Sequence, residues 1–346
     1  MKVMLIGDLH FGERGDSRDF NQHILDFIDW VVEKRDSLGV THVVQLGDWF
    51  HHRNKIQVQT LSYGIEGAKR LGAAFGRENV YVLEGNHDLY YLDRLDVSSV
   101  TALKPYVTVV DKPTTILEDF LATPWIVSPE QWDEVVNSSS THKYLLAHLE
   151  LNGFKVNDAY TMEHGLSHKE LKDYEIVFTG HYHSPQIKDN ILYTGTPYPI
   201  TMNEANEDHG VYVFDTGTDD LQFFKYDGIR VISVSFDELS ELDIESLPHK
   251  GVSIRVEFPD DIEDESLIEK TREILAEKNF EEVKIKYRGQ KAKQLIEADV
   301  TDVEFVENID SAVIGFIENS AEVEGVDKDV LKLLYHAAVA KGDEIG

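Results

Sequence analysis

Several mostly apolar runs in this chain each lead straight into a carboxylate, an imidazole or an amide. The clearest example is residues 43–46, Val-Val-Gln-Leu, which lead through Gly47 to Asp48. Apolar runs of this length that end at a glycine are typical of buried strands. A carboxylate just beyond such a strand lies at the sheet edge where open α/β proteins collect their chemistry. The pattern therefore predicts a buried sheet with a polar site along one edge.

The N-terminal region alternates between strand and helix patterns. The apolar residues of the helical segments recur at helical spacing, and Gly39 lies just past the end of the first one. Alternation of this kind implies right-handed crossovers and a largely parallel sheet. The expected strands are residues 2–6, 42–46 and 80–83, and the expected helices are 19–38 and 58–75.

Shorter apolar runs follow, and we expect them to form a second sheet. Loop signals at Pro124, 138–141 and 152–165 separate some of these runs. Packing of this sheet on the first would give an α/β fold, a layered β-sandwich flanked by helices. The expected strands are residues 106–110, 115–117, 121–123, 144–147, 175–178, 191–193 and 211–214.

The C-terminal third has a different pattern. Strands expected at 230–236, 252–258 and 283–287, with a helix at 265–278, indicate a small α+β domain. The composition then turns acidic, and two short amphipathic helices are expected at 309–317 and 327–340. We therefore predict three parts, residues 1–226, 227–300 and 301–346.

Composition narrows the classes of function. The chain has no cysteine, which excludes disulfides, zinc–thiolate sites and iron–sulfur clusters and fits a reducing compartment. No apolar run approaches the roughly 18 residues of a membrane span, and residues 1–6 are too short for a secretory signal, so we predict a cytoplasmic protein that does not enter the membrane. The net charge of −31 repels nucleic acid at long range. A nucleic-acid substrate would therefore require basic patches, metal ions or a partner protein.

The polar residues at the ends of the expected strands form a candidate metal site. Asp8 and His10 are two residues apart, as are His181 and His183, and this spacing puts both side chains on one face of extended backbone. Oxygen and nitrogen donors without sulfur suit Mn²⁺, Fe²⁺ or Zn²⁺. Two ions that share a carboxylate can use more donors than one ion and still leave room for substrate. The full set is Asp8, His10, Asp48, Asn86, His87, His148, His181 and His183.

Each of these residues also has an ordinary structural explanation. A single aspartate after a strand is usually a helix cap or turn residue, and Asn86 between Gly85 and His87 suits a turn. His148 alone could be a hydrogen-bonded core histidine, and the two histidines around Tyr182 could be surface residues. Their joint occurrence at five strand ends favours the metal site.

The motifs, taken in order, resemble those of the calcineurin-like metallophosphoesterases, and they cover residues 1–215. The phosphoprotein phosphatase branch normally has Asp-Arg-Gly after the second motif and Glu in the third, where this chain has Trp-Phe-His-His-Arg at 49–53 and Asp88. These features are similar instead to the SbcD-like nuclease subunits of recombination and repair complexes and their phage counterparts. The Gly-Thr-Pro-Tyr-Pro loop at 195–199 also resembles that branch, which usually has Gly-Ser-Pro there. The motifs are Asp8-Leu9-His10, Gly47-Asp48, Gly85-Asn86-His87-Asp88, His148 and Gly180-His181-Tyr182-His183.

The resemblance implies a role for each motif residue. Asp8, His10 and His183 would hold one metal ion; Asn86, His148 and His181 would hold the second; and Asp48 would bridge them. His87 would lie beside the scissile phosphate, and His51 matches a further phosphate-facing histidine of the nuclease branch. His52 has no counterpart and is expected at the surface. The usual activating metal of the family is Mn²⁺, and Mg²⁺ is the alternative.

The resemblance also implies an activity: metal-dependent hydrolysis of DNA phosphodiester bonds, as an exonuclease and endonuclease, by a two-metal mechanism. The enzyme would act in DNA recombination and repair with an ABC-type coiled-coil ATPase, as a homodimer. One alternative is a phosphodiesterase or phosphatase for small nucleotides or phosphoproteins. Another is a non-catalytic adaptor of the ATPase, but such a protein would have no reason to keep an intact ligand set.

Two further surfaces follow from the same reading. The basic residues around Tyr287 are a candidate DNA contact, although an exposed strand and turn with charges for solubility explains them equally well. The two C-terminal helices would dock on the coiled coil of the ATPase, or alternatively pack on their own domain. The predicted DNA contacts are Lys284, Lys286, Arg288, Lys291 and Lys293.

Overall fold

The structure is a computed structural model that describes residues 1–157, 160–242, 251–259, 265–278, 280 and 282–287. Within it, Met1–Lys286 forms one compact unit. The predicted C-terminal helices at 309–317 and 327–340 lie outside the described residues, and so do Arg288, Lys291 and Lys293. The predicted domain boundaries stay predictions.

The first sheet is largely parallel, as the alternating pattern predicts. β1 pairs with β2, β2 with β3 and β3 with β4 in parallel, and the last two strands extend the sheet beyond β1 in antiparallel fashion. The order across the sheet is β14 (Asp220–Lys225), β13 (Gly210–Asp215), β1 (Lys2–Ile6), β2 (His42–Gln45), β3 (Val80–Leu83) and β4 (Thr108–Val110).

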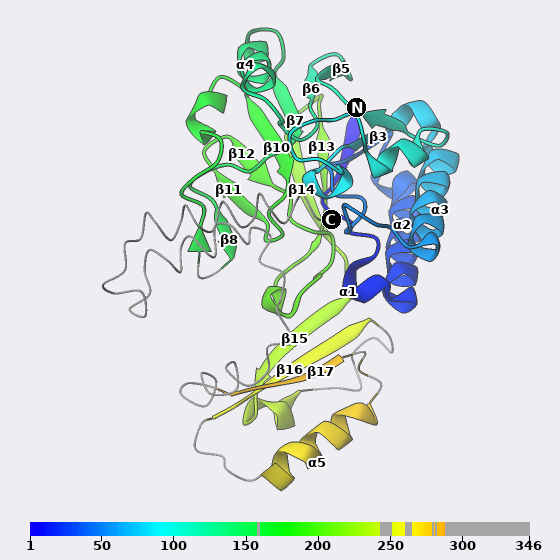
Figure 1. The fold of residues 1–346 in the computed structure, drawn as a ribbon, viewed down its shortest axis with the longest axis vertical. Coiled ribbons are helices and arrows are strands. Elements are labelled where there is room, and N and C mark those ends of the chain that lie inside the picture. Colours follow the sequence, from blue (N-terminus) through cyan, green and yellow to red (C-terminus); the bar gives the residue numbers. More distant parts are fainter. Residues whose placement is uncertain (158–159, 243–250, 260–264, 279, 281, 288–346) are drawn as a thin grey trace, which may run out of the picture. The chain divides into compact units, whose positions relative to one another are not determined.

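Two helices, α2 (Arg18–Leu38) and α3 (Val58–Phe75), cover the outer face of this sheet (Figure 1). The Oγ of Ser17 caps α2 at its start and Gly39 ends it in the left-handed region, as expected for a helix with these termini. The short α1 (Glu13–Asp16) precedes them. Successive side chains of β1 point to opposite faces of the sheet. One set packs on the helices, and the other set points away from them.

The second sheet has a parallel centre and antiparallel edges. β12, β10, β7 and β6 are parallel neighbours, and the outermost strands run antiparallel to them. The helix α4 (Pro129–Asn137) contributes Trp132 and Val135 to the core on the outer face of this sheet. The order is β11 (Gln186–Lys188), β12 (Ile191–Tyr193), β10 (Ile176–Gly180), β7 (Tyr144–His148), β6 (Phe120–Ala122) and β5 (Thr114–Ile116).

A third cluster of buried side chains lies between the two sheets. Val3 and Leu5 of the first sheet pack there with Leu146 and Phe178 of the second, while Met4 points toward α2 and α3. The result is a layered α/β sandwich with helices on its outer faces, which confirms the predicted fold class (Figure 1).

The small α+β elements also form where they are expected. They are β15 (Arg230–Ser235), β16 (Val252–Phe258), α5 (Glu265–Ala276) and β17 (Glu282–Tyr287), with the strands in the order β15-β16-β17. None of the helices in the described ranges is both long enough and apolar enough to cross a bilayer.

Some elements differ from the expectation. The region 152–165, predicted as a loop, contains the short strands β8 (Lys155–Asn157) and β9 (Tyr160–Thr161). The sequence reading also missed α4, β11 and β14. β14 is mostly exposed and β11 is a three-residue edge strand, so neither carries an apolar run. By contrast, α4 had a readable signal, because Ser128 caps it and Pro129 opens it.

Candidate metal centre

The carboxyl ends of five strands bring the predicted ligands together. Asp8 and His10 follow β1, Asp48 follows β2, and Asn86 and His87 follow β3 in the first sheet. His148 is the last residue of β7, and His181 and His183 follow β10 in the second sheet. Within the described residues, three groups of side chains place their ligand atoms within 4.8 Å of one another. These groups are Asp8, His10 and His183; Asp48, His148 and His181; and His10, His51 and His87.

The first donor group is Asp8, His10 and His183. The carboxylate of Glu204 fixes the orientation of the His183 ring. The Nδ1 atom of His183 lies 3.1 Å from Oε1 of Glu204, a carboxylate that is 5% exposed. Burial alone would raise the pKa of Glu204, but the hydrogen bond and the charge of His183 lower it. An ionised Glu204 accepts a hydrogen bond from Nδ1–H, so Nε2 is the atom of His183 that is suited to a metal ion.

The second donor group, Asn86, His148 and His181, converges on the side-chain oxygen of Asn86. Nδ1 of His148 donates to the Leu46 carbonyl over 2.7 Å, and its Nε2 lies 2.8 Å from Oδ1 of Asn86. Nδ1 of His181 lies 3.0 Å from the same oxygen, and its Nε2 lies 3.5 Å from Glu150. The donors of this group are therefore Nε2 of one histidine, Nδ1 of the other and an amide oxygen.

Asp48 lies between the two groups. Its Oδ2 is 3.3 Å from Nε2 of His148 and 3.9 Å from Nε2 of His10. Its Oδ1 accepts from the backbone N–H of His87 over 2.8 Å, and its backbone carbonyl accepts from Leu9 and His10. These bonds hold one carboxylate oxygen facing both donor groups, which is the position that a bridging ligand requires.

His10 shows that the site fits a metal ion. The residue is 1% exposed, and within the described part of the chain neither of its ring nitrogens has a hydrogen-bond partner. A buried polar group left without a partner costs about 1–3 kcal/mol, so proteins rarely keep one without a reason. A divalent cation would provide the missing partner, and donors made only of oxygen and nitrogen suit Mn²⁺, Fe²⁺ or Zn²⁺.

Without a metal ion, burial and neighbouring charges shift the pKa values of several ionisable groups in the site. Burial raises the pKa of Asp8 to about 7, and burial together with nearby His87 holds the pKa of His10 well below its usual value. Burial alone would also raise the pKa of Asp48, but the imidazoles of His148 and His87 hold it well below its usual value. For His148 burial is outweighed by Asp48 and Asp8, which raise its pKa to about 9. A cation would relieve the repulsion between the two aspartates.

The backbone of the site is also unusual. His10, Asp48 and His181 have φ values of 52°, 55° and 98°, which place all three in a region that non-glycine residues rarely adopt. Glycines provide the close approaches around them. A Cβ atom at Gly85 would lie 2.1 Å from Oδ1 of Asp48, and one at Gly180 would lie 2.4 Å from Oδ1 of Asp8.

The three other histidines of the motifs lie beside the donor groups. Nδ1 of His87 is 2.6 Å from the backbone carbonyl of His51, and the His87 ring lies 4.9 Å from that of His10. Nδ1 of His51 is 2.6 Å from the carboxylate of Glu13. His52 is 39% exposed and faces Asp16 at 3.5 Å, in line with its expected surface position.

Sequence reasoning missed four acidic residues that support the site. Asp88 is the most connected of them: it is 1% exposed and accepts from the N–H groups of Gly85, Trp49 and Phe50, which joins the second motif to the third. Burial, and then the nearby Asp48, raises its pKa to about 7. The others are Glu13, Glu150 and Glu204.

The sequence carries a signal for only one of these four. Thr201 and Glu204 have the Thr-x-x-Glu spacing of a helix-capping motif, which indicates a local role and not a contact with His183. Glu13 and Glu150 contact their partners only through the fold, and so does Asp88 apart from its local bond to Gly85.

The predicted DNA contacts are only partly described. Lys284 and Lys286 lie on β17, two residues apart and therefore on one face of the strand. The side chain of Lys284 is 38% exposed and lies 3.3 Å from the carboxylate of Glu282. The patch therefore contains an acid among its bases, and its role in binding DNA stays a prediction.

The family model of the calcineurin-like phosphoesterase superfamily domain matches residues 1–217, which include every residue of the two donor groups. The chain belongs to this superfamily. The resemblance expected from the motifs is thereby confirmed, and this calcineurin-like protein is an enzyme, a metal-dependent phosphodiesterase.

Two relatives of this calcineurin-like phosphoesterase have names that refer to nucleases or DNA repair. Exonuclease subunit 1 of Enterobacteria phage T4 is 32% identical over 233 residues, which cover 64% of this chain and 67% of the phage protein. The DNA double-strand break repair protein Mre11 of Nanoarchaeum equitans (strain Kin4-M) is 21% identical over 242 residues, which cover 62% of this chain and 66% of that protein.

Solved structures match less closely. A dimetal phosphatase from Danio rerio has 13% identity and a TM-score of 0.41, with coverage of 62% of this chain and 91% of that one. The nuclease MPE of Pseudomonas putida has 20% identity and a TM-score of 0.31, with coverage of 61% and 83%. At this distance neither match says anything about the substrate.

Proposed function

We propose that this protein is a Mn²⁺-dependent DNA exonuclease and endonuclease that uses two metal ions. The observation that carries the proposal is the place of Asp48, whose Oδ2 faces His10 in one donor group and His148 in the other. Two ions that share a carboxylate are suited to phosphodiester hydrolysis. The names of the phage T4 and archaeal relatives support DNA as the substrate.

Each donor group has a defined task in this proposal. Asp8, His10 and His183 hold one ion, Asn86, His148 and His181 hold the other, and Asp48 contacts both. When bound, the two cations activate water and neutralise the charge that develops on the phosphoryl group. The protein itself supplies orientation, because the histidines are held by Leu46, Glu150 and Glu204.

His87 is the proposed proton donor. Nδ1 of His87 donates to the His51 carbonyl, and this bond fixes the orientation of the ring. Nε2 is then the ring atom that would contact the substrate. In this position His87 can stabilise the scissile phosphate or protonate the 3′ oxygen that leaves. His51, held by Glu13, would contact a second phosphate oxygen.

The wider assignments belong to the same proposal. The enzyme would be the nuclease subunit of a complex with an ABC-type coiled-coil ATPase, acting as a homodimer on DNA in the cytoplasm. The helices predicted at 309–317 and 327–340 would bind the ATPase, and Lys284 and Lys286 would contact DNA together with the other basic residues around Tyr287.

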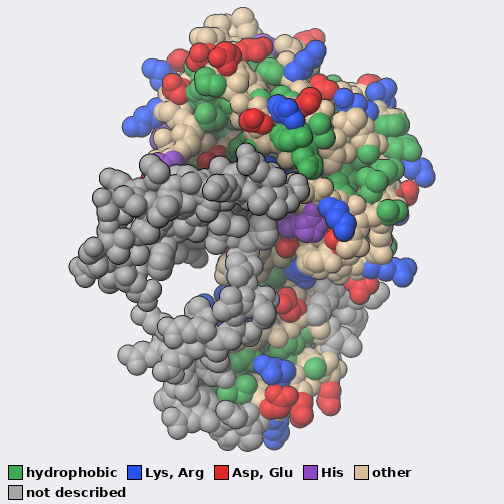
Figure 2. All heavy atoms as spheres, in the orientation of Figure 1, with side chains coloured by type: hydrophobic (Ala, Val, Ile, Leu, Met, Phe, Trp, Pro, Cys, Tyr) green, Lys and Arg blue, Asp and Glu red, His purple; other side chains and the backbone are tan. Residues whose placement is uncertain are grey.

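On the face drawn in Figure 2, acidic and basic side chains are interspersed, and histidine side chains reach the surface most visibly in one patch.

The decisive experiment uses His87→Ala with His52→Ala as its matched control. On linear duplex and single-stranded DNA with Mn²⁺, His87→Ala should lower turnover by a factor of about 10²–10⁴, the range of general acid catalysis. Its metal content should equal that of the wild type, because His87 is in neither donor group that holds an ion here. His52→Ala should keep most of the activity, since His52 is 39% exposed and belongs to neither donor group, although its ring lies 4.7 Å from that of His51.

The outcome also separates the rival functions. Turnover of small diesters or phosphopeptides that exceeds turnover of DNA would identify a phosphodiesterase or phosphatase instead. A wild-type protein that binds metal and hydrolyses none of these substrates would be an adaptor. A His87→Ala variant that has lost its metal would overturn the division of labour between His87 and the donor groups.

A further inference from the structure

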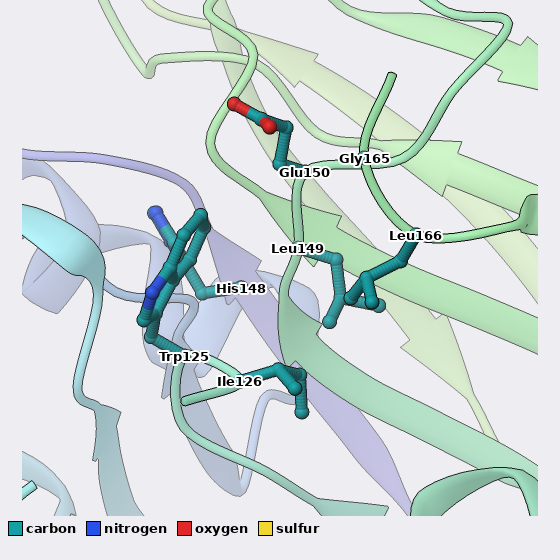
Figure 3. A pocket seen from close by; sticks show the side chains of 7 residues that line it. All are labelled: Trp125, Ile126, His148, Leu149, Glu150, Gly165 and Leu166. Carbon is teal, nitrogen blue, oxygen red and sulfur yellow. The ribbon is translucent and has the colours of Figure 1, made fainter. Parts of the chain in front are cut away.

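A hollow opens beside the second donor group (Figure 3). Its volume is ≈ 130 Å³. An apolar cavity of about 150 Å³ accommodates benzene, so this hollow has the size of one aromatic ring. The residues that line it are Trp125, Ile126, His148, Leu149, Glu150, Gly165 and Leu166.

The hollow adjoins the atoms that would hold the phosphate. The Trp125 ring lies 5.3 Å from that of His181 and 6.0 Å from that of His148, and both histidines belong to the second donor group. Leu149 and Glu150 continue the chain directly from His148. A ligand whose phosphate contacts this donor group would therefore have its next chemical group at the hollow.

The walls favour a particular kind of group. Three aliphatic side chains and one indole supply apolar and aromatic surface, and the described residues that line the hollow include no lysine or arginine. Its one carboxylate, Glu150, is 28% exposed, which disfavours a second phosphate and favours a group that donates N–H bonds. Nucleobases combine a flat aromatic face with N–H donors, and they stack on aromatic side chains irrespective of sequence.

Backbone hydrogen bonds fix the walls in place. The N–H of Trp125 donates to the Glu84 carbonyl over 2.8 Å, and the side chain of Gln131 donates to the Trp125 carbonyl over 3.2 Å. On the other wall, the N–H of Leu166 donates to the Glu150 carbonyl over 3.0 Å. The hollow is thus built in advance, and a ligand need not order it on binding.

We infer that this hollow binds the nucleobase of the nucleotide whose phosphate lies at the metal centre, with Trp125 as the stacking surface and Glu150 as the hydrogen-bond acceptor. The inference rests on the proposed nuclease function and narrows its substrate. A base can enter the hollow only after it leaves the stack of a duplex. The enzyme should therefore act on single strands and frayed ends in preference to intact internal duplex.

The test measures nucleotide binding and does not depend on turnover. Calorimetry compares deoxycytidine 5′-monophosphate with 2-deoxyribose 5-phosphate on the Mn²⁺-loaded protein. The nucleotide should bind about tenfold more tightly than the sugar phosphate, which is within the range of base–aromatic stacking. In Trp125→Leu the two ligands should bind alike, whereas Trp125→Phe should restore most of the difference. Phe223→Ala, which removes an aromatic side chain 38% exposed on β14, should behave as the wild type.

Each result decides the inference. Equal binding of the two ligands by the wild type, or an unchanged difference in Trp125→Leu, would overturn it even if the protein cleaves DNA. A protein that cleaves no DNA but shows the Trp125-dependent difference would overturn the proposed nuclease and leave the base site in place. Thermal unfolding and metal content of Trp125→Leu exclude simple misfolding as the cause of a lost difference.

Discussion

The two six-stranded sheets contribute different chemistry to one site. The first sheet supplies every carboxylate and the amide of the two donor groups, together with His10, while the second supplies imidazoles only. Neither sheet carries a complete group, because Asp8 and His10 need His183 and Asn86 needs His148 and His181. The metal centre therefore forms only where the two sheets pack against one another.

The backbone contacts follow the same division. The carboxylate of Asp8, from the first sheet, accepts from the N–H of His181 in the second over 3.0 Å. In return, Nδ1 of His148 from the second sheet donates to the Leu46 carbonyl of the first. Each sheet therefore orients ligands that belong to the other, so metal binding should stabilise the interface between them.

The strongest test of this comparison is Asp48→Ala. Asp48 is the one ligand placed between both groups, so its loss should remove both ions and lower DNA hydrolysis by more than about 10³-fold, since residues that act as a unit fail together. Metal analysis and turnover measure the effect. Asp36→Ala, which removes a carboxylate that is 94% exposed, is the control. A variant that keeps one tightly bound ion would mean that the groups are independent.

A methyl group can disturb the contact between the sheets without removing a ligand. In Gly180→Ala the added Cβ would lie 2.4 Å from Oδ1 of Asp8 and 2.7 Å from the Leu46 carbonyl, both in the first sheet. We expect a loss of about 1–3 kcal/mol in the free energy of unfolding together with loss of metal. Denaturant unfolding measures the first. Gly217→Ala, where the nearest atom is 3.4 Å away, should change neither.

The orientation of the imidazoles can be tested at Glu204. Glu204→Gln keeps the size of the side chain but removes the negative charge opposite Nδ1 of His183. Metal affinity should fall by about 10–100-fold, as it does when partners of ligating histidines are changed. Titration with Mn²⁺ measures it, and Glu207→Gln serves as the control. Unchanged affinity would show that His183 needs no help from Glu204.

The pH dependence of metal binding tests the electrostatics of the metal-free site. Without metal, Asp8 stays protonated below about pH 7 and His148 below about pH 9, and both must lose their protons to bind a cation. Metal affinity should therefore rise from pH 6 to pH 9, with protons released on binding. Calorimetry in buffers of different ionisation enthalpy counts these protons. Metal affinity that stays constant from pH 6 to pH 9 would contradict the raised pKa values of Asp8 and His148 in the metal-free site.

The strands that carry the site were readable from the sequence, because each is an apolar run with an abrupt polar end. β1 and β3 occur at the predicted residues, and the predicted α3 has the bounds 58–75. Elements without such a pattern were not readable: β14 is an exposed strand, and β8 and β9 are too short to show a period.

The candidate ligands were readable for the same reason, whereas their supporting residues were not. Asp88 lies within a motif but contacts Trp49 and Phe50, and Glu13 contacts His51, through contacts that only the fold creates. The hollow at Trp125 could not be predicted from the sequence, because its walls come from three separate segments of the chain. No spacing rule connects residues 125, 150 and 166.

The spread of the donors along the chain has a consequence for biosynthesis. Asp8 is synthesised long before its partners, and its group stays incomplete until His183 and the supporting Glu204 have followed. A nascent chain shorter than this has no complete pair of donor groups. Under the proposed function, the growing polypeptide would be unable to cleave nucleic acid until Glu204 has been made and both sheets have closed on one another.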